Sequence, residues 1–171
     1  MDNQYQIVDN FMPEDSFELL SSTIMSSNFP WYYLPLVNYL DDDSQCLVNR
    51  YFEHNFFTYY EETESYGKSF RFDDVKSFLD LLEINKLYRV KSNLFTSTES
   101  LVQYAFHCDQ PFKHKGAILY LNDCDGYTVL QDGTKIESVA NRCLLFDSSK
   151  PHASTTCTNQ KARFNINVNY S

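Results

Sequence analysis

From residue 86 onward the sequence is a succession of short apolar and aromatic segments, and this feature constrains the fold most. Turn sequences such as DCDG (123–126) and QDGT (131–134) bound the segments, and no helical pattern lies between them. This layout favours a β-sandwich or barrel over a parallel sheet with crossover helices. The six predicted segments span residues 86–97, 103–110, 116–123, 127–138, 141–148 and 163–170.

The first 85 residues mix helical and extended patterns. No Ser-, Gly- or Pro-rich linker separates them from the β-rich part. We therefore predict a single domain, 1–171, of the mainly β (α+β) class, in which residues 1–85 buttress a core formed by 86–171. The predicted elements are a strand at 4–11, a helix at 13–27, an edge strand or extended segment at 29–37, a loop at 41–44, a strand or helix at 49–60 and a helix at 70–85.

Composition narrows the functional classes. A formal net charge of −9 disfavours binding to nucleic acid, and no apolar run is long enough to span a membrane. The five cysteines are odd in number and form no CxxC pair, so a zinc ribbon or a redox motif is not supported. The N-terminus lacks a signal-peptide pattern. These features predict a reduced, soluble, cytoplasmic protein.

Two histidines and an aspartate interrupt the segment QYAFHCDQPFKHKG (103–116). Side chains alternate along a strand, so His107 and Asp109 are predicted to share one face and could supply two ligands to one metal ion. Cys108 would then point the other way, into the core. His114 lies beyond Pro111, where the alternation is lost, and is predicted to be a solvated turn residue.

A third ligand must come from elsewhere in the chain. His152 follows an apolar strand and lies 45 residues after His107, which is enough for intervening hairpin strands to bring it back beside that residue. Two histidines and one carboxylate, without a thiolate, suit iron(II) better than structural zinc. Cys157 lies near His152 and is predicted to be an inert thiol.

The segment 163–170 alternates strictly between apolar and polar residues. Its apolar face can pack under the helices, and its polar face, which includes Asn165, must look into a wet cavity or a hydrogen-bond network. Arg163 on this face is suited to bind a carboxylate with two parallel hydrogen bonds. Tyr120, on a face shared with Asn122, could contact the same carboxylate. Two further cations, Arg89 and Lys91, are interpreted as surface charges by default, with the lining of a groove as the alternative.

These residues together resemble the iron(II)- and 2-oxoglutarate-dependent dioxygenases, specifically their prolyl-4-hydroxylase-like branch, which includes short phage-encoded members. The family pattern is H-x-D, a distal histidine and a basic residue about ten positions later; here it is matched by residues 107–109, His152 and Arg163. The segment Tyr120-Leu121-Asn122 resembles the family's YLN. The resemblance covers roughly 86–170, and the N-terminal part agrees only in general shape.

The resemblance implies a double-stranded β-helix, also called a jelly roll or cupin-like fold, with the N-terminal helices packed on the larger sheet. It implies iron(II) on His107, Asp109 and His152, and 2-oxoglutarate held at its distal carboxylate by Arg163 and Tyr120. With O2 as the oxidant, such an enzyme hydroxylates a C–H bond and releases succinate and CO2. Asn165 and Asn122 would line the active site.

The substrate could be a prolyl residue in a peptide or protein, or a small molecule. Two other functions remain open at this point. A cupin-like metal-dependent oxygenase of a small molecule would not use 2-oxoglutarate, and would leave Arg163 and Tyr120 unexplained. A non-catalytic β-sandwich binding protein would have no need of an intact set of metal ligands. The sequence sets neither the regiochemistry nor the oligomeric state.

Overall fold

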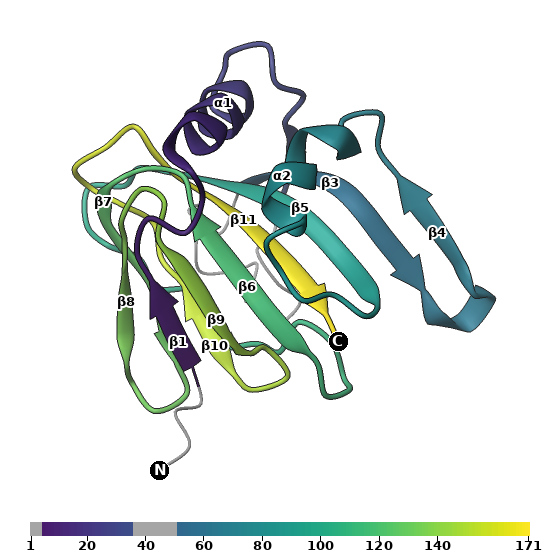
Figure 1. The fold of residues 1–171 in the computed structure, drawn as a ribbon. Helices are drawn as coiled ribbons and strands as arrows, with labels where there is room; N and C mark the ends of the chain where they lie inside the picture. Colours follow the sequence, from purple (N-terminus) through teal and green to yellow (C-terminus); the bar gives the residue numbers. More distant parts are fainter. Residues whose placement is uncertain (1–4, 36–50) are drawn as a thin grey trace.

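A computed structural model describes residues 5–35 and 51–171, so the predicted loop at 41–44 lies outside the described residues. Strands dominate the described part (Figure 1). No helix in it is long and apolar enough to cross a membrane. In chain order the elements are β1 (Tyr5–Val8), α1 (Glu14–Ile24), β2 (Tyr32–Leu34), β3 (Tyr51–Tyr60), η1 (Glu61–Thr63), β4 (Ser65–Lys68), η2 (Phe72–Val75), α2 (Lys76–Leu79), β5 (Leu87–Thr96), β6 (Lys115–Tyr120), β7 (Cys124–Leu130), β8 (Lys135–Ser138), β9 (Cys143–Asp147), β10 (His152–Ser154) and β11 (Ala162–Tyr170).

The strands form a large and a small antiparallel sheet. The large sheet has the order β1-β9-β6-β11-β5-β3-β2, with β4 paired to β3, and the small sheet has the order β10-β7-β8. After β5 and β6 in the large sheet, the chain visits the small sheet twice, through β7–β8 and through β10, before β11 returns to the large sheet between β5 and β6. This crossing between two facing sheets is the predicted jelly-roll architecture, and the fold-class prediction is confirmed.

The helices cover one face of the large sheet, as predicted (Figure 1). Ile24 of α1 and Phe78 of α2 are buried in one apolar cluster with Ile166 and Val168 of β11. At about 25 cal/mol for each Å² of apolar surface removed from water, this burial is a main source of the free energy that holds the helices in place. A second cluster lies on the other face of the sheet and joins β6 and β9 to β7 and β8.

The helix predicted at 70–85 is mostly absent. A 3-10 turn over Phe72–Val75 and a single α-helical turn over Lys76–Leu79 replace it. Val75, Phe78 and Leu79 are all buried. Two tight turns therefore satisfy the apolar pattern, and no longer helix is needed. The segment 49–60, for which a strand or a helix was expected, is a strand from residue 51.

The prediction of a regular strand at 103–110 is wrong in its detail. It makes only two isolated bridges, Gln103 with Thr155 and His107 with His152. The segment lies beside β10, which has only three residues, so most of the segment has no neighbouring strand with which to form a continuous ladder of hydrogen bonds. The bridges still place the segment beside β10, as an irregular outer row of the small sheet.

Candidate active site

Three side chains that are far apart in the sequence converge between the two sheets. The nitrogen and oxygen atoms that His107, Asp109 and His152 could offer to a metal all lie within 4.8 Å of one another. The backbone causes this approach: the amides of His107 and His152 donate to each other's carbonyls at 2.9 and 3.0 Å. Asp109 then reaches between the two rings, with carboxylate oxygens 3.9 Å from His107 Nε2 and 3.7 Å from His152 Nε2.

Backbone carbonyls fix the orientation of both imidazole rings. Nδ1 of His107 lies 3.4 Å from the carbonyl oxygen of Ala105, and Nδ1 of His152 lies 3.0 Å from that of Lys150. A carbonyl can only accept, so each Nδ1 carries the proton and each Nε2 turns a lone pair toward the centre of the cluster. Burial, together with the neighbouring His152, lowers the pKa of His107 to about 4, so its ring is neutral at neutral pH.

The carboxylate of Asp109 is held from three sides. Arg89 Nη2 donates to Oδ1 at 2.6 Å, while Nδ2 of Asn167 and Nδ2 of Asn169 donate to Oδ2 at 3.2 and 2.9 Å. Burial alone would raise the pKa of this carboxyl, but the charge of Arg89 and the other partners hold it well below its ordinary value. The cluster is thus an ionised carboxylate and two imidazoles with inward lone pairs, a donor set that fits iron(II).

Arg163, predicted to lie on the polar face of 163–170 and to bind a carboxylate, lies deep in the same region. Its side chain is fully buried and donates to the hydroxyl of Ser154, to the carbonyl of Thr155 at 3.3 Å and to Thr128 Oγ1 at 3.0 Å. Within residues 5–35 and 51–171, no carboxylate pairs with this guanidinium and its Nε has no hydrogen-bond partner. A buried cation without an anion is costly, so the site is built to receive one.

The spacing between the two ends of the site fits a short dicarboxylate. His152, in the metal cluster, and Ser154, bonded to Arg163, are two residues apart on β10, or about 6.6 Å along a strand. A five-carbon dicarboxylic acid can span that distance. Gly126 leaves room for the arginine, because a Cβ at this position would lie 2.6 Å from Arg163 Cδ. The residues therefore fit 2-oxoglutarate as well as iron(II).

Solved structures of similar shape bear on this geometry. A prolyl hydroxylase from Trichoplax adhaerens, in complex with a peptide fragment of the oxygen degradation domain of hypoxia inducible factor, superposes with a TM-score of 0.68 at 15% identity, over 99% of this chain and 84% of that one. An oxidoreductase of the 2OG-Fe(II) oxygenase family from Burkholderia pseudomallei gives 0.66 at 10% identity, over 99% and 85%. A prolyl-4-hydroxylase from Pseudomonas putida gives 0.60 at 14% identity, over 99% and 92%.

The chain has the fold of the 2-oxoglutarate-dependent iron oxygenases. At these identities the likeness shows the fold alone, and the chemistry must be argued from the residues of this chain. No protein-family model matches the sequence, and no curated protein matches it either.

Within this oxygenase fold, Tyr120 lies beside Arg163, with the ring centre 5.4 Å from the guanidinium carbon. Its hydroxyl donates to Thr128 Oγ1 at 2.8 Å, and that oxygen also accepts from Arg163. A hydroxyl that accepts two hydrogen bonds keeps its own proton to donate. Thr128, which sequence reasoning missed, is thus placed to bind a carboxylate directly, together with Arg163.

The two predicted lining asparagines have different places. A small cavity between the sheets is lined by His107, Asp109 and His152, and Asn165 lines it as well. Asn165 accepts a hydrogen bond from Asn93 at 2.8 Å. Asn122 does not line the cavity: its Nδ2 donates to the carbonyl of Ala162 at 3.0 Å, and its Oδ1 accepts from the amide of Phe164 at 2.9 Å. Asn122 therefore joins the end of β6 to β11 and has a structural role.

Two further predictions, about residues close to His107 and Asp109 in the sequence, are wrong. His114 is only 4% exposed, with Nδ1 2.8 Å from the carbonyl of Phe112, because the aromatic rings of Tyr88 and Phe112 pack against its imidazole. Cys108 is exposed and not in the core, since its segment runs outside the regular sheet. Cys157 agrees with the prediction: it is buried, and burial raises the pKa of its thiol to about 11.

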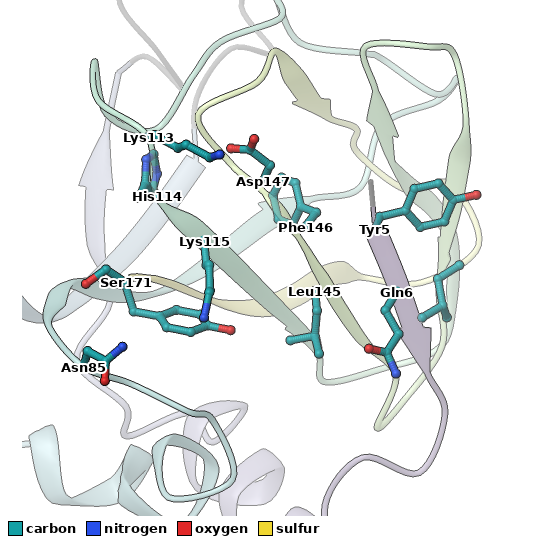
Figure 2. A pocket seen from close by; sticks show the side chains of 12 residues that line it. Tyr5, Gln6, Asn85, Lys113, His114, Lys115, Leu145, Phe146, Asp147 and Ser171 are labelled. Carbon is teal, nitrogen blue, oxygen red and sulfur yellow. The ribbon is translucent and has the colours of Figure 1, made fainter. Parts of the chain in front are cut away.

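A depression much larger than the cavity of the metal cluster lies elsewhere on the described part of the molecule. Its volume is about 950 Å³ and it lies along β1, β9, β6 and the end of β11 (Figure 2). Leu145 and Tyr170 line it, and both pack with the cluster on the helix-covered face of the large sheet. None of the three candidate metal ligands lines this depression, so size alone does not identify the active site.

Proposed function

We propose that this protein is an iron(II)- and 2-oxoglutarate-dependent dioxygenase that hydroxylates a C–H bond. One observation supports the proposal most. A cluster of two imidazoles and a carboxylate lines the same cavity as Thr128 and Ser154, and both of these accept hydrogen bonds from a buried arginine that has no carboxylate partner among the described residues, at a separation that suits the two ends of 2-oxoglutarate.

Each residue has a defined task in this proposal. His107, Asp109 and His152 hold the iron, and Arg163 with Thr128 binds the distal carboxylate of 2-oxoglutarate. Tyr120 positions Thr128 through its hydroxyl. Iron(II), 2-oxoglutarate and O2 together supply the oxidising chemistry, whose products are the hydroxylated substrate, succinate and CO2. The chain orients these components and keeps the cavity poor in water.

The substrate proposed first is a prolyl residue of a peptide or protein. A similar structure, the Trichoplax prolyl hydroxylase, was solved with a bound peptide. A small-molecule substrate is the alternative. A cupin-like oxygenase without 2-oxoglutarate is less well supported, since it would bury Arg163 with no anion to receive. We propose that the enzyme acts in the cytoplasm, because its thiols follow no disulfide or metal motif.

Anaerobic addition of iron(II) and 2-oxoglutarate tests the function. A weak visible charge-transfer band should appear with the wild-type protein and vanish in His107→Ala and Asp109→Ala. Asp73→Ala, on the surface, is the matched control and should keep the band. Under air, the wild type should release succinate slowly, and faster with a substrate among proline-containing peptides and free amino acids. No band and no succinate would refute the proposal.

A further inference from the structure

Lys91 lies in the candidate active site, although no step of the proposed function uses it. It is on β5, opposite Asn167 of β11, which holds the carboxylate of Asp109. Its side chain is only 15% exposed and lines the same cavity as the three candidate metal ligands. A lysine is rarely placed in such a position without a partner, because its desolvation is costly.

Two neighbours on β3 hold the ammonium group of Lys91. Nζ donates to the hydroxyl oxygen of Tyr51 and to Glu53 Oε2, both at 3.1 Å, and the Tyr51 hydroxyl donates to the same Glu53 oxygen at 2.8 Å. An ammonium group has three donors. Of the residues that the structure describes, only these two accept from it, so one donor is left for a ligand in the cavity.

The balance of charge indicates what that ligand is. Among the residues that the structure describes, three cations and two carboxylates either line the cavity or form hydrogen bonds with side chains that line it. Arg89 pairs with Asp109 and Lys91 pairs with Glu53, which leaves Arg163 in excess. Iron(II) adds two positive charges and 2-oxoglutarate removes two, so the loaded site keeps one positive charge too many. An unneutralised charge in a water-poor cavity favours the binding of a further anion.

We propose that Lys91 is a second carboxylate-binding residue of this cavity, on the side of the metal cluster, with Tyr51 and Glu53 positioning its ammonium group. The proposal rests on the proposed function, because the excess charge follows from iron and 2-oxoglutarate. A carboxylate has two possible sources: the keto-acid end of 2-oxoglutarate, or an acidic group on the primary substrate. The charge balance favours the second source, and the experiment separates the two.

The first arm is calorimetric titration of the anaerobic, iron(II)-loaded protein with 2-oxoglutarate. The variant is Lys91→Met, which keeps the volume and removes the charge. The surface change Lys76→Met is the matched control. If the keto-acid end is the source, the affinity of Lys91→Met for 2-oxoglutarate should fall about 10- to 100-fold, as for a lost hydrogen bond to a charged group. Because Lys91→Met strands the Glu53 carboxylate, Lys91→Met/Glu53→Gln is titrated beside it and should lose affinity to the same degree.

The second arm uses protein already saturated with 2-oxoglutarate. N-acetyl-L-proline and N-acetyl-L-prolinamide are titrated separately, since they differ in the carboxylate alone. If the substrate is the source, the wild type should bind the acid at least 10-fold more tightly than the amide, and Lys91→Met should abolish the preference. Unchanged 2-oxoglutarate affinity in Lys91→Met, together with no preference for the acid in the wild type, would overturn the proposal. Failure of the wild type to bind 2-oxoglutarate at all would instead overturn the proposed function.

Discussion

Removing the charge of Arg163 should leave the folded state as stable as before or more stable, and should weaken the binding of 2-oxoglutarate. In Arg163→Met the buried guanidinium is replaced by an apolar side chain that can pack between Phe95 and Tyr120, whose ring centres lie 5.6 and 5.4 Å from the guanidinium carbon. The variant loses three hydrogen bonds but also a buried cation that pairs with no described carboxylate. Replacing buried charges by apolar groups is often neutral or stabilising. The ligand-free variant should therefore unfold with a free energy equal to that of the wild type or up to about 2 kcal/mol higher.

The affinity for 2-oxoglutarate, in contrast, should fall in this variant. A ligand at 100 times its dissociation constant stabilises a folded protein by about 2.7 kcal/mol. For a chain of 171 residues this corresponds to a rise in melting temperature of roughly 5–10 °C. Loss of the charged contact should weaken 2-oxoglutarate binding by at least about 100-fold, the lower end of the range for two hydrogen bonds to a charged group. The same ligand concentration would then raise the melting temperature of Arg163→Met by at most about 1 °C.

The assay is thermal unfolding, followed by circular dichroism under anaerobic conditions, with no addition, with iron(II), and with iron(II) and 2-oxoglutarate. Wild type and Arg163→Met should gain equally from iron, because the arginine contacts none of the three candidate ligands. Only the wild type should gain further from 2-oxoglutarate. A full 2-oxoglutarate shift in the variant, or loss of the iron shift as well, would show that Arg163 is a structural residue and refute the assignment.

Four other substitutions or treatments test single features. Gly126→Ala should weaken 2-oxoglutarate binding and cost about 1–3 kcal/mol of stability, because its Cβ would displace the arginine beside it; calorimetry and urea unfolding measure the two effects. Asn122→Ala should lower the urea concentration at the unfolding midpoint and leave the affinity for 2-oxoglutarate unchanged. A weaker affinity would show that Asn122 does belong to the binding site. At pH 8 a maleimide should label Cys108 and spare Cys157, whose thiol has a raised pKa of about 11, and site-resolved mass spectrometry can check this. Burial lowers the pKa of His54 below its ordinary 6.5, so the unfolded chain binds a proton more readily; stability should fall as the pH drops from about 7 to 5, and His54→Gln should flatten that slope in urea titrations.

The predictions that succeeded rest on alternation, in which successive side chains of a segment point to opposite faces. In the segment 163–170, apolar and polar residues alternate strictly. Once the apolar face is assigned to the core, the surroundings of the polar face follow as well. Ile166 and Val168 do pack beneath the helices, and Asn167 and Asn169, on the other face, do enter a hydrogen-bond network with the carboxylate of Asp109. The parity argument also brought His107 and Asp109 to one side, although their segment is hardly a strand.

The failures concern contacts that only distant elements supply. His114 was expected in solvent because Pro111 ends the pattern before it; the ring of Tyr88, on another strand, buries it. Arg89 and Lys91 were taken as surface charges, yet both belong to the site. Their alternation with Tyr88 and Val90 was visible in the sequence. To predict from this alternation that Arg89 and Lys91 face the site, one must know that β5 lies beside β11, and no local pattern reveals that.

The position of β11 has a consequence for how the molecule is assembled. This strand follows all the others described along the chain, yet it lies between β5 and β6 in the middle of the large sheet. During synthesis, the two strands on either side of it emerge first and must wait with open edges and uncovered apolar surface. The strand that closes this gap also carries Arg163 and the asparagines around Asp109. Closure of the sheet and completion of the site are therefore one late event, and a partly folded chain should bind neither metal nor co-substrate.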